Sequence, residues 1–90
     1  MDTDNDIIYI YDNLYTLKYR IENNVVYDDN YIVRYRIQGN EIYDRLYTLR
    51  YRIEDDKIYD RLYNLLYKIE NDKIYDKFYT LKYRIEKTRE

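Results

Sequence analysis

The sequence predicts an all-β protein, an antiparallel β-meander of five hairpin repeats that is strongly sheared and curls into a barrel or a solenoid. Three observations support this fold. A 16-residue unit recurs five times without an insertion. The unit is rich in Tyr, Ile, Thr, Val and Arg and contains no Ala or Pro, which suits pleated, partly buried strands. Pairs of Asn, Asp and Gly recur at the joints, and these residues tolerate the positive φ angles of two-residue hairpin turns.

The repeats form a single domain. The fourth copy reads IYDRLYNLLYKIENDK, and the others keep its spacing. The predicted boundaries are an N-terminal cap over 1–9 and repeats over 10–25, 26–41, 42–57, 58–73 and 74–89. A 90-residue chain has a small core, and stacking one repeat on the next is one way to stabilise it.

A helical period is also present, because Ile42, Leu46, Leu49 and Ile53 fall on one face of a helix. One continuous helix is excluded, since 16 residues rotate that face by about 160°. An array of short α-helices therefore stays the alternative fold.

The joint at 55–56 fixes a strand register. A two-residue turn there places Glu54 opposite Lys57, a favourable pair of opposite charges, and Ile53 opposite Ile58. A one-residue slip would scatter the apolar residues over both faces, so the alternation supports this register.

A second two-residue turn is predicted at 61–62, which would place Ile58 opposite Leu65. Each long strand would then pair with two short strands and leave part of its edge unpaired. Such edges are closed by curling, by coiling or by a partner chain. Pairing between open edges predicts a homodimer as one outcome.

The predicted outward face interleaves basic residues with tyrosines. Its candidate partner-binding residues are Lys18, Arg20, Arg34, Arg36, Tyr43, Arg50, Arg52, Tyr59, Lys68, Tyr75, Lys82 and Arg84. Cations neutralise phosphates and aromatic rings stack on bases, so this pattern suits single-stranded RNA or DNA. The competing interpretation is a solvated face on which Tyr and Arg stack on each other. The net charge of −2 favours the second interpretation.

The opposite face is predicted to be buried and rich in tyrosine. Its tyrosines are Tyr15, Tyr19, Tyr31, Tyr35, Tyr47, Tyr51, Tyr63, Tyr67, Tyr79 and Tyr83. A buried phenol needs a hydrogen-bond partner, so we expect this core to stay partly wet. Structural packing is the expected role of most of these residues.

Several function classes find no support in the composition. The chain has no His, Cys or Ser and one Gly, so it lacks the usual bases, nucleophiles and phosphate loops, and we expect no enzyme and no cofactor. Asp2, Asp4 and Asp6 resemble the start of a calcium loop, but Ile7 and Asn13 break the pattern, so no metal site is predicted. Without an apolar span or a basic leader, the expected location is cytoplasmic, with no membrane partner.

The spacing from Ile-Tyr-Asp to Arg-Ile-Glu over residues 10–86 resembles bacterial and phage-associated repeat arrays of the form I-Y-D-x-x-G-x-x-I-G-x-I-E-x-G. Those arrays use Gly where this chain has Leu46, Leu62 and Phe78, and Tyr51 also replaces a Gly. The resemblance implies a β-meander and no particular activity.

The leading functional prediction is a non-catalytic β-repeat module that binds another protein, such as a phage or mobile-element inhibitor of a host defence protein, of which anti-CRISPR proteins are one kind. Binding would use open strand edges, with Tyr and Arg giving specificity. The alternatives are a single-stranded nucleic-acid binder that uses the Arg/Tyr face and a self-associating structural protein.

Overall fold

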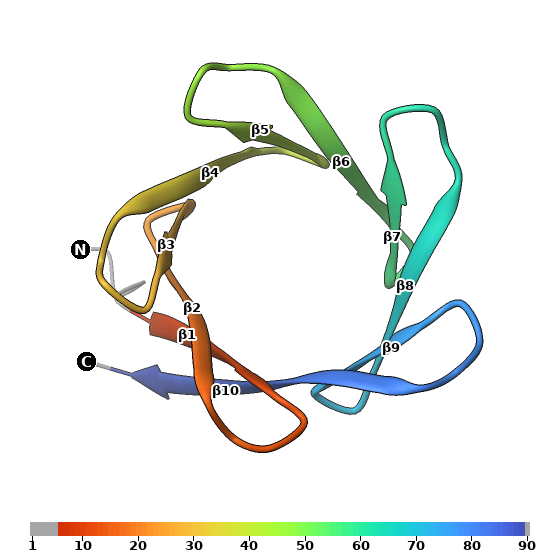
Figure 1. Cartoon of the computed structure of the whole chain (residues 1–90). Helices are drawn as coiled ribbons and strands as arrows, with labels where there is room; N and C mark the ends of the chain where they lie inside the picture. The colour runs from red at the N-terminus through yellow and green to blue at the C-terminus, as the bar shows by residue number, and fades with distance from the viewer. Residues whose placement is uncertain (1–5, 90) are drawn as a thin grey trace.

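The computed structural model describes residues 6–89, which form ten strands and no helix. The strands are β1 (Asp6–Asp12), β2 (Leu17–Glu22), β3 (Val25–Asp28), β4 (Val33–Gln38), β5 (Glu41–Asp44), β6 (Leu49–Glu54), β7 (Lys57–Asp60), β8 (Leu65–Glu70), β9 (Lys73–Asp76) and β10 (Leu81–Arg89). Successive strands pair antiparallel and β1 also pairs with β10, so the sheet closes into a barrel (Figure 1). The predicted β-meander is confirmed, and the alternative helical array is wrong.

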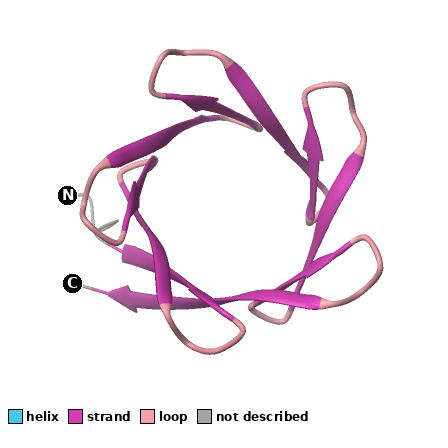
Figure 2. Cartoon of the chain, in the orientation of Figure 1, coloured by secondary structure: helices cyan, strands magenta, loops and turns pink. Residues whose placement is uncertain are grey.

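One end of the barrel carries the predicted two-residue turns (Figure 2). The first residue of each turn has a positive φ of 52° to 59°: Asn23, Gly39, Asp55 and Asn71. The predicted register of this hairpin is confirmed, with Glu54 opposite Lys57 and Ile53 opposite Ile58. The turn sequence thus determines the pairing of the strands on either side of it.

The predicted two-residue turn at 61–62 is wrong, because the connection from β7 to β8 spans residues 61–64. The carboxylate of Asp60 holds this wider loop, since its Oδ1 accepts hydrogen bonds from the amides of Leu62 at 2.8 Å and Asn64 at 2.9 Å. Ile58 therefore faces Tyr67 instead of Leu65, and Leu66 becomes the extra residue of a β-bulge. The loops after Asp12, Asp28, Asp44 and Asp76 are held in the same way.

This loop geometry corrects the predicted position of half of the tyrosines. Five loop tyrosines expected on the buried face are more than half exposed: Tyr15, Tyr31, Tyr47, Tyr63 and Tyr79. Each has a φ between 64° and 69°, the left-handed region that ordinary residues rarely adopt. The ring of Tyr63 consequently lies beside that of the outward-facing Tyr59, with the centroids 5.6 Å apart.

The barrel closes through the same strand register that its hairpins use. Ile10 faces Ile85 and Tyr11 faces Arg84 across β1 and β10, as Ile58 faces Ile53 elsewhere. The first and last strands therefore lie side by side (Figure 1). β1 begins at Asp6, inside the segment predicted as a cap, and residues 1–5 of that cap lie outside the described residues.

Closure also removes the open edges on which the predicted strand addition and edge-paired homodimer depended. Within residues 6–89 every strand has a neighbour on both sides. The two edge strands of the sheet, β1 and β10, pair with each other, so neither edge is open to another strand.

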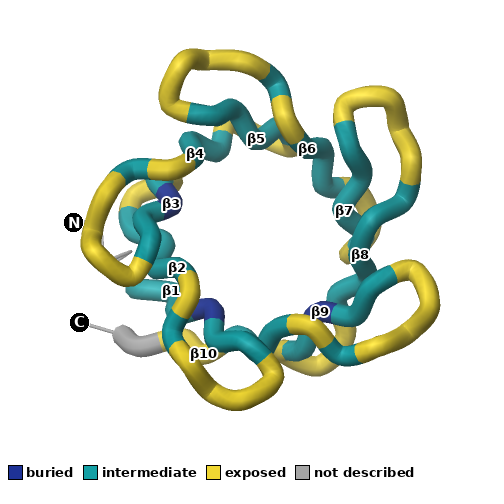
Figure 3. Tube along the Cα trace, viewed as in Figure 1, coloured by how far each residue is buried: buried dark blue, intermediate teal, exposed yellow. Residues whose placement is uncertain are grey.

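The core of the barrel is thin. The most buried apolar side chains are Ile10, Val26 and Ile74, at 7% to 8% exposure, and most other strand residues are partly buried (Figure 3). A barrel of eight strands is just wide enough to be filled by side chains, so one of ten has more room inside. None of the described residues lies in a helix long and apolar enough to cross a membrane.

Candidate functional site

One tyrosine from each repeat lies on the inner face of the barrel: Tyr19, Tyr35, Tyr51, Tyr67 and Tyr83. The rings of Tyr35 and Tyr51 meet edge-on at 5.7 Å although β5 lies between their strands, which requires a concave surface. Burial, followed by the hydroxyl of Tyr35, raises the pKa of Tyr51 to about 12. Burial likewise raises the pKa of Tyr19 and Tyr83. These three phenols are therefore neutral at ordinary pH and can both donate and accept hydrogen bonds.

On the outer surface the loop tyrosines pack on basic residues of the preceding repeat. The ring of Tyr63 lies 4.9 Å from Cζ of Arg52, and its hydroxyl donates to Oε2 of Glu54 at 2.8 Å. Arg52 also donates to Oε2 of Glu41 at 3.1 Å. The same cation contact joins Tyr31 to Arg20 at 4.9 Å, Tyr79 to Lys68 at 5.6 Å and Tyr15 to Arg84 at 4.8 Å.

These contacts show how the predicted Arg/Tyr face is arranged. Arg20, Arg52, Lys68 and Arg84 already have aromatic rings as neighbours, as the solvated-face interpretation expects. The Nε atoms of Arg36, Arg52 and Arg84 are buried and have no hydrogen-bond partner within residues 6–89. Three outward tyrosines of the predicted face contact loop tyrosines at 4.8 to 6.0 Å: Tyr43, Tyr59 and Tyr75. Much of this face is therefore engaged in contacts within the barrel.

The other predicted basic ladder lies elsewhere, because each of its members is the extra residue of a β-bulge: Lys18, Arg34, Arg50 and Lys82. All four are exposed. Arg34 and its neighbour Tyr35 line the same cavity, which strict alternation along a strand would forbid. The prediction that both ladders share the outward face is therefore wrong for Arg34 and Arg50, and the bulge is the physical reason.

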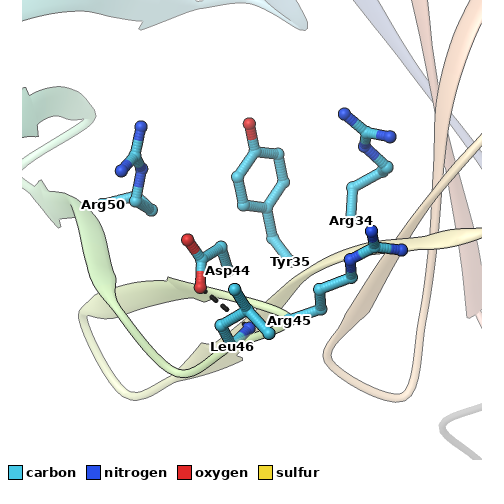
Figure 4. Close-up of a pocket in the computed structure, with 6 residues that line it drawn as sticks. All are labelled: Arg34, Tyr35, Asp44, Arg45, Leu46 and Arg50. Carbon is cyan, nitrogen blue, oxygen red and sulfur yellow. Dashed lines mark hydrogen bonds between the residues drawn. The ribbon is translucent and has the colours of Figure 1, made fainter.

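This cavity has a volume of about 270 Å³ and is lined by Arg34, Tyr35, Asp44, Arg45, Leu46 and Arg50. Tyr35 stands between Arg34 and Arg50, with the polar ends of all three pointing the same way (Figure 4). The amides of Thr48 and Leu46 donate to Oδ1 of Asp44 at 3.0 and 2.9 Å, and with Arg50 and Arg45 nearby they lower the pKa of Asp44. Three guanidinium groups and one ionised carboxylate leave the lining with a charge of +2.

A related cavity of about 310 Å³ lies one repeat further along, lined by Leu49, Arg50, Tyr51, Asp60, Arg61 and Leu62. Tyr51, Asp60 and Arg61 correspond to Tyr35, Asp44 and Arg45 of the first cavity. Leu66 occupies the position that corresponds to the third arginine, so this lining carries a charge of +1. The repeat thus builds similar cavities that differ in charge.

The tips of the long loops expose large apolar side chains. Leu14, Leu46, Leu62 and Phe78 are 73% to 81% exposed. A basic residue precedes the apolar one in three consecutive repeats, at 45–46, 61–62 and 77–78, and we call these six residues the tip sector. The first loop has Asn13 before Leu14, and the second has Asp29-Asn30. Exposed apolar side chains mark an interaction surface where they are covered together by one partner.

The predicted two-residue turn at Arg61-Leu62 hides the tip sector, because it leaves no four-residue loop with an exposed tip. The available signal was the apolar residue itself, because turns favour Gly, Asn, Asp, Ser and Pro. A bulky apolar residue at this position of four loops, that of Leu14 included, has no local structural reason.

These features define a closed, ten-stranded β-meander barrel built from five hairpin repeats, with a basic and apolar loop end. Comparisons with protein-family models, curated proteins and solved structures gave no match. The likeness to Ile-Tyr-Asp repeat arrays rests on residue spacing alone. Among residues 6–89 no group of three or more His, Cys, Asp or Glu is placed to hold a metal ion, and Asp2 and Asp4 lie outside that range.

Proposed function

We propose that this protein is a non-catalytic binding module that docks on another protein through the tip sector. The observation that supports this function most is the exposure of Leu46, Leu62 and Phe78, at 81%, 73% and 78%. Burying one such side chain at an interface contributes about 1.5–3 kcal/mol. Each of the three follows a cation in the sequence, and they lie on three consecutive loops around the barrel (Figure 1).

The chemistry of the tips indicates the kind of partner. Arg45 and Arg61 make no ion pair within 4.0 Å in the described part of the chain. A protein surface with apolar pockets and carboxylates would complement them, because opposite charges steer association and fix orientation. An inhibitor or adaptor from a mobile element that covers such a surface on a host protein fits this proposal.

Nucleic-acid binding and self-association are the competing functions. Single strands bind by stacking bases on free aromatic rings, whereas most loop tyrosines here already pack on a cation. Self-association through edges would need unpaired strands, and residues 6–89 have none. Both considerations favour a protein partner at the loop end.

The experiment compares capture of partners from a lysate by the wild-type protein and by the triple variant L46N/L62N/F78N. Asparagine is the natural residue at the corresponding position of the second repeat, Asn30, so the loop tolerates it. Leu14→Asn removes an equally exposed leucine outside the tip sector and is the matched control.

We expect the triple variant to lose a protein that the wild type and Leu14→Asn both retain. The complex is then rebuilt from purified components and its affinity measured by calorimetry. Light scattering at low and high salt detects self-association through the mass of the particle. The ratio of ultraviolet absorbance in the nucleic-acid band to that in the protein band detects bound nucleic acid. Equal affinity for wild type and triple variant, or binding that disappears with nuclease, would overturn the proposal.

A further inference from the structure

We infer that the cavity between β4 and the β5–β6 loop binds a phosphate-class oxoanion, held by Arg34, Arg45 and Arg50 with the hydroxyl of Tyr35. This site goes beyond the proposed function, because it needs a small anion and not a protein partner. We call it the three-arginine cavity.

The first argument is that its donors are uncommitted. Arg45 and Arg50 form no ion pair within 4.0 Å with any described residue, and Arg34 reaches only Oδ2 of Asp28, at 4.0 Å. The side chain of Arg34 is 52% exposed, so that long contact is readily exchanged. A guanidinium group presents several donors in a planar fork that matches the oxygens of a phosphate.

The second argument is that the one carboxylate in the cavity is held in the loop. Oδ1 of Asp44 accepts the amides of Leu46 and Thr48, at 2.9 and 3.0 Å. The carboxylate therefore stays on the loop side and neutralises one of the three cations. The remaining charge of +2 matches a phosphate dianion better than a monovalent anion. The hydroxyl of Tyr35 adds a donor between two of the arginines (Figure 4).

The third argument compares repeats of nearly identical sequence. One repeat further along, Leu66 stands at the position that corresponds to Arg50, and the lining of the neighbouring cavity has two arginines instead of three. In the second repeat Asp29 stands at the position of Arg45. The fold needs neither arginine, since these repeats pair their strands in the same way. Folding therefore gives no reason for three arginines around one cavity, and anion binding supplies one.

The test titrates the whole protein with inorganic phosphate and with pyrophosphate at low ionic strength, followed by calorimetry and by NMR of backbone amides. We expect shifts confined to the lining residues. Arg45→Gln should weaken binding about tenfold or more, because a hydrogen bond to a charged group is lost. Arg61→Gln removes the same charge from the neighbouring cavity and should change the affinity less than about twofold.

A variant that gains a binding site complements the loss-of-binding variants, because misfolding can abolish binding but cannot create it. Leu66→Arg supplies the arginine that is missing one repeat further along. Because Arg50 lines both cavities, we expect phosphate to bind in either one, with new amide shifts at Tyr51, Asp60 and Arg61. Equal weakening by Arg61→Gln and Arg45→Gln would show attraction by general charge and overturn the inference. Failure of Leu66→Arg to add a site, together with unlocalised shifts in the wild type, would also overturn it.

A parallel arm with phenyl phosphate distinguishes free phosphate from a phosphate carried on a larger molecule. Tighter binding of the ester assigns the cavity to a phosphomonoester, and tighter binding of phosphate assigns it to the free anion. Either result supports the site. The double tip variant L62N/F78N leaves every residue that lines this cavity in place, so a failure here is separate from a failure of the proposed function.

Discussion

Tyr15 packs on Arg84, with its ring centroid 4.8 Å from the guanidinium carbon, and this contact joins the first repeat to the last. Tyr31 makes the same contact with Arg20 in the preceding repeat, at 4.9 Å. The strand pair β1–β10 also has the register of the internal hairpins. The first and last repeats therefore meet through the same interface that holds consecutive repeats together. The five repeats form a ring with nearly five-fold symmetry, in which one hairpin turn is missing between β10 and β1.

The position of this missing turn should be movable. Glu86 faces Tyr9 as Glu54 faces Lys57, so an Asn-Gly turn can join Glu86 to Tyr9 while new ends open between Asp55 and Asp56. We expect this circular permutant to fold to the same barrel, shown by an unchanged circular dichroism spectrum and a cooperative urea transition. A permutant opened between Tyr51 and Arg52, inside β6, should be far less stable. If both permutants are equally unstable, the ring does not close as described.

Tyr47 is a second test, because it combines a φ of 65° with few contacts. Its ring lies 6.0 Å from that of Tyr43 and its side chain is 58% exposed. Glycine adopts this backbone without strain, whereas alanine keeps the strain and loses the ring. We expect Tyr47→Gly to be more stable than Tyr47→Ala by about 1 kcal/mol, measured by urea unfolding.

The same exchange at Tyr63 provides the comparison. Its ring packs on Arg52 and its hydroxyl donates to Glu54, so glycine there loses contacts that Tyr47→Gly does not. We expect Tyr63→Gly to be more destabilising than Tyr47→Gly. The opposite order would mean that the ring contacts with cations contribute little to holding the repeats together.

The sequence predicted one end of the barrel better than the other. At 55–56 the turn residues and the charge pair of Glu54 and Lys57 point to a single register, and the structure has it. At the other end the loop depends on a carboxylate that accepts two backbone hydrogen bonds. Alternation alone cannot show this, so the bulge at Leu66 and the outward position of Tyr63 were not predicted.

The closure of the barrel and the positions of the candidate sites could not be predicted from the sequence, for related reasons. Whether five repeats form a ring depends on strand twist and shear accumulated over all of them, and no single repeat encodes it. Arg34 and Arg50 were recognised as candidate contacts, but placing them beside Tyr35 required the bulge. The exposure of Leu46 follows from the width of its loop, which the spacing of the repeat does not determine.

Asp60 should contribute to stability in a pH-dependent way. Hydrogen bonds from the backbone and side chain of Asn64, with that from Leu62, lower its pKa below the ordinary 3.8. Because the folded pKa is lower than the unfolded one, this contribution is present above pH 3.8 and is lost as the pH falls through the folded value. We expect the urea midpoint of the wild type to fall more steeply below that pH than the midpoint of Asp60→Asn.

Asp60→Ala separates the hydrogen bonds from the charge. It removes both backbone hydrogen bonds to Oδ1, whereas Asp60→Asn keeps an acceptor oxygen. We expect Asp60→Ala to be the less stable of the two at neutral pH. Equal stability of the two variants would show that the carboxylate does not hold the loop through these bonds.

The inner tyrosines predict unfolding in alkali. The pKa of Tyr51 is raised from 10.0 to about 12 by burial and then by Tyr35, and burial also raises those of Tyr19 and Tyr83. A folded pKa above the unfolded one means that the unfolded state loses its proton first. The stability these phenols contribute is therefore complete below pH 10 and is lost as the pH rises toward 12. Ultraviolet difference absorbance, which reports tyrosinate, should rise together with the loss of circular dichroism over this range.

Tyr51→Phe identifies the contribution of a single phenol. Without an ionisable group at this position, the variant should lose less stability than the wild type between pH 10 and 12, whatever its stability at neutral pH. The control is Tyr47→Phe, which changes a tyrosine that is 58% exposed outside the barrel. This variant should lose stability with rising pH as steeply as the wild type does. Identical slopes for wild type and Tyr51→Phe would mean that solvent reaches the inner hydroxyls freely. The inner phenols would then ionise inside an intact barrel, and closure of the ring would have to be stabilised chiefly by the isoleucine pairs and the outer tyrosine contacts.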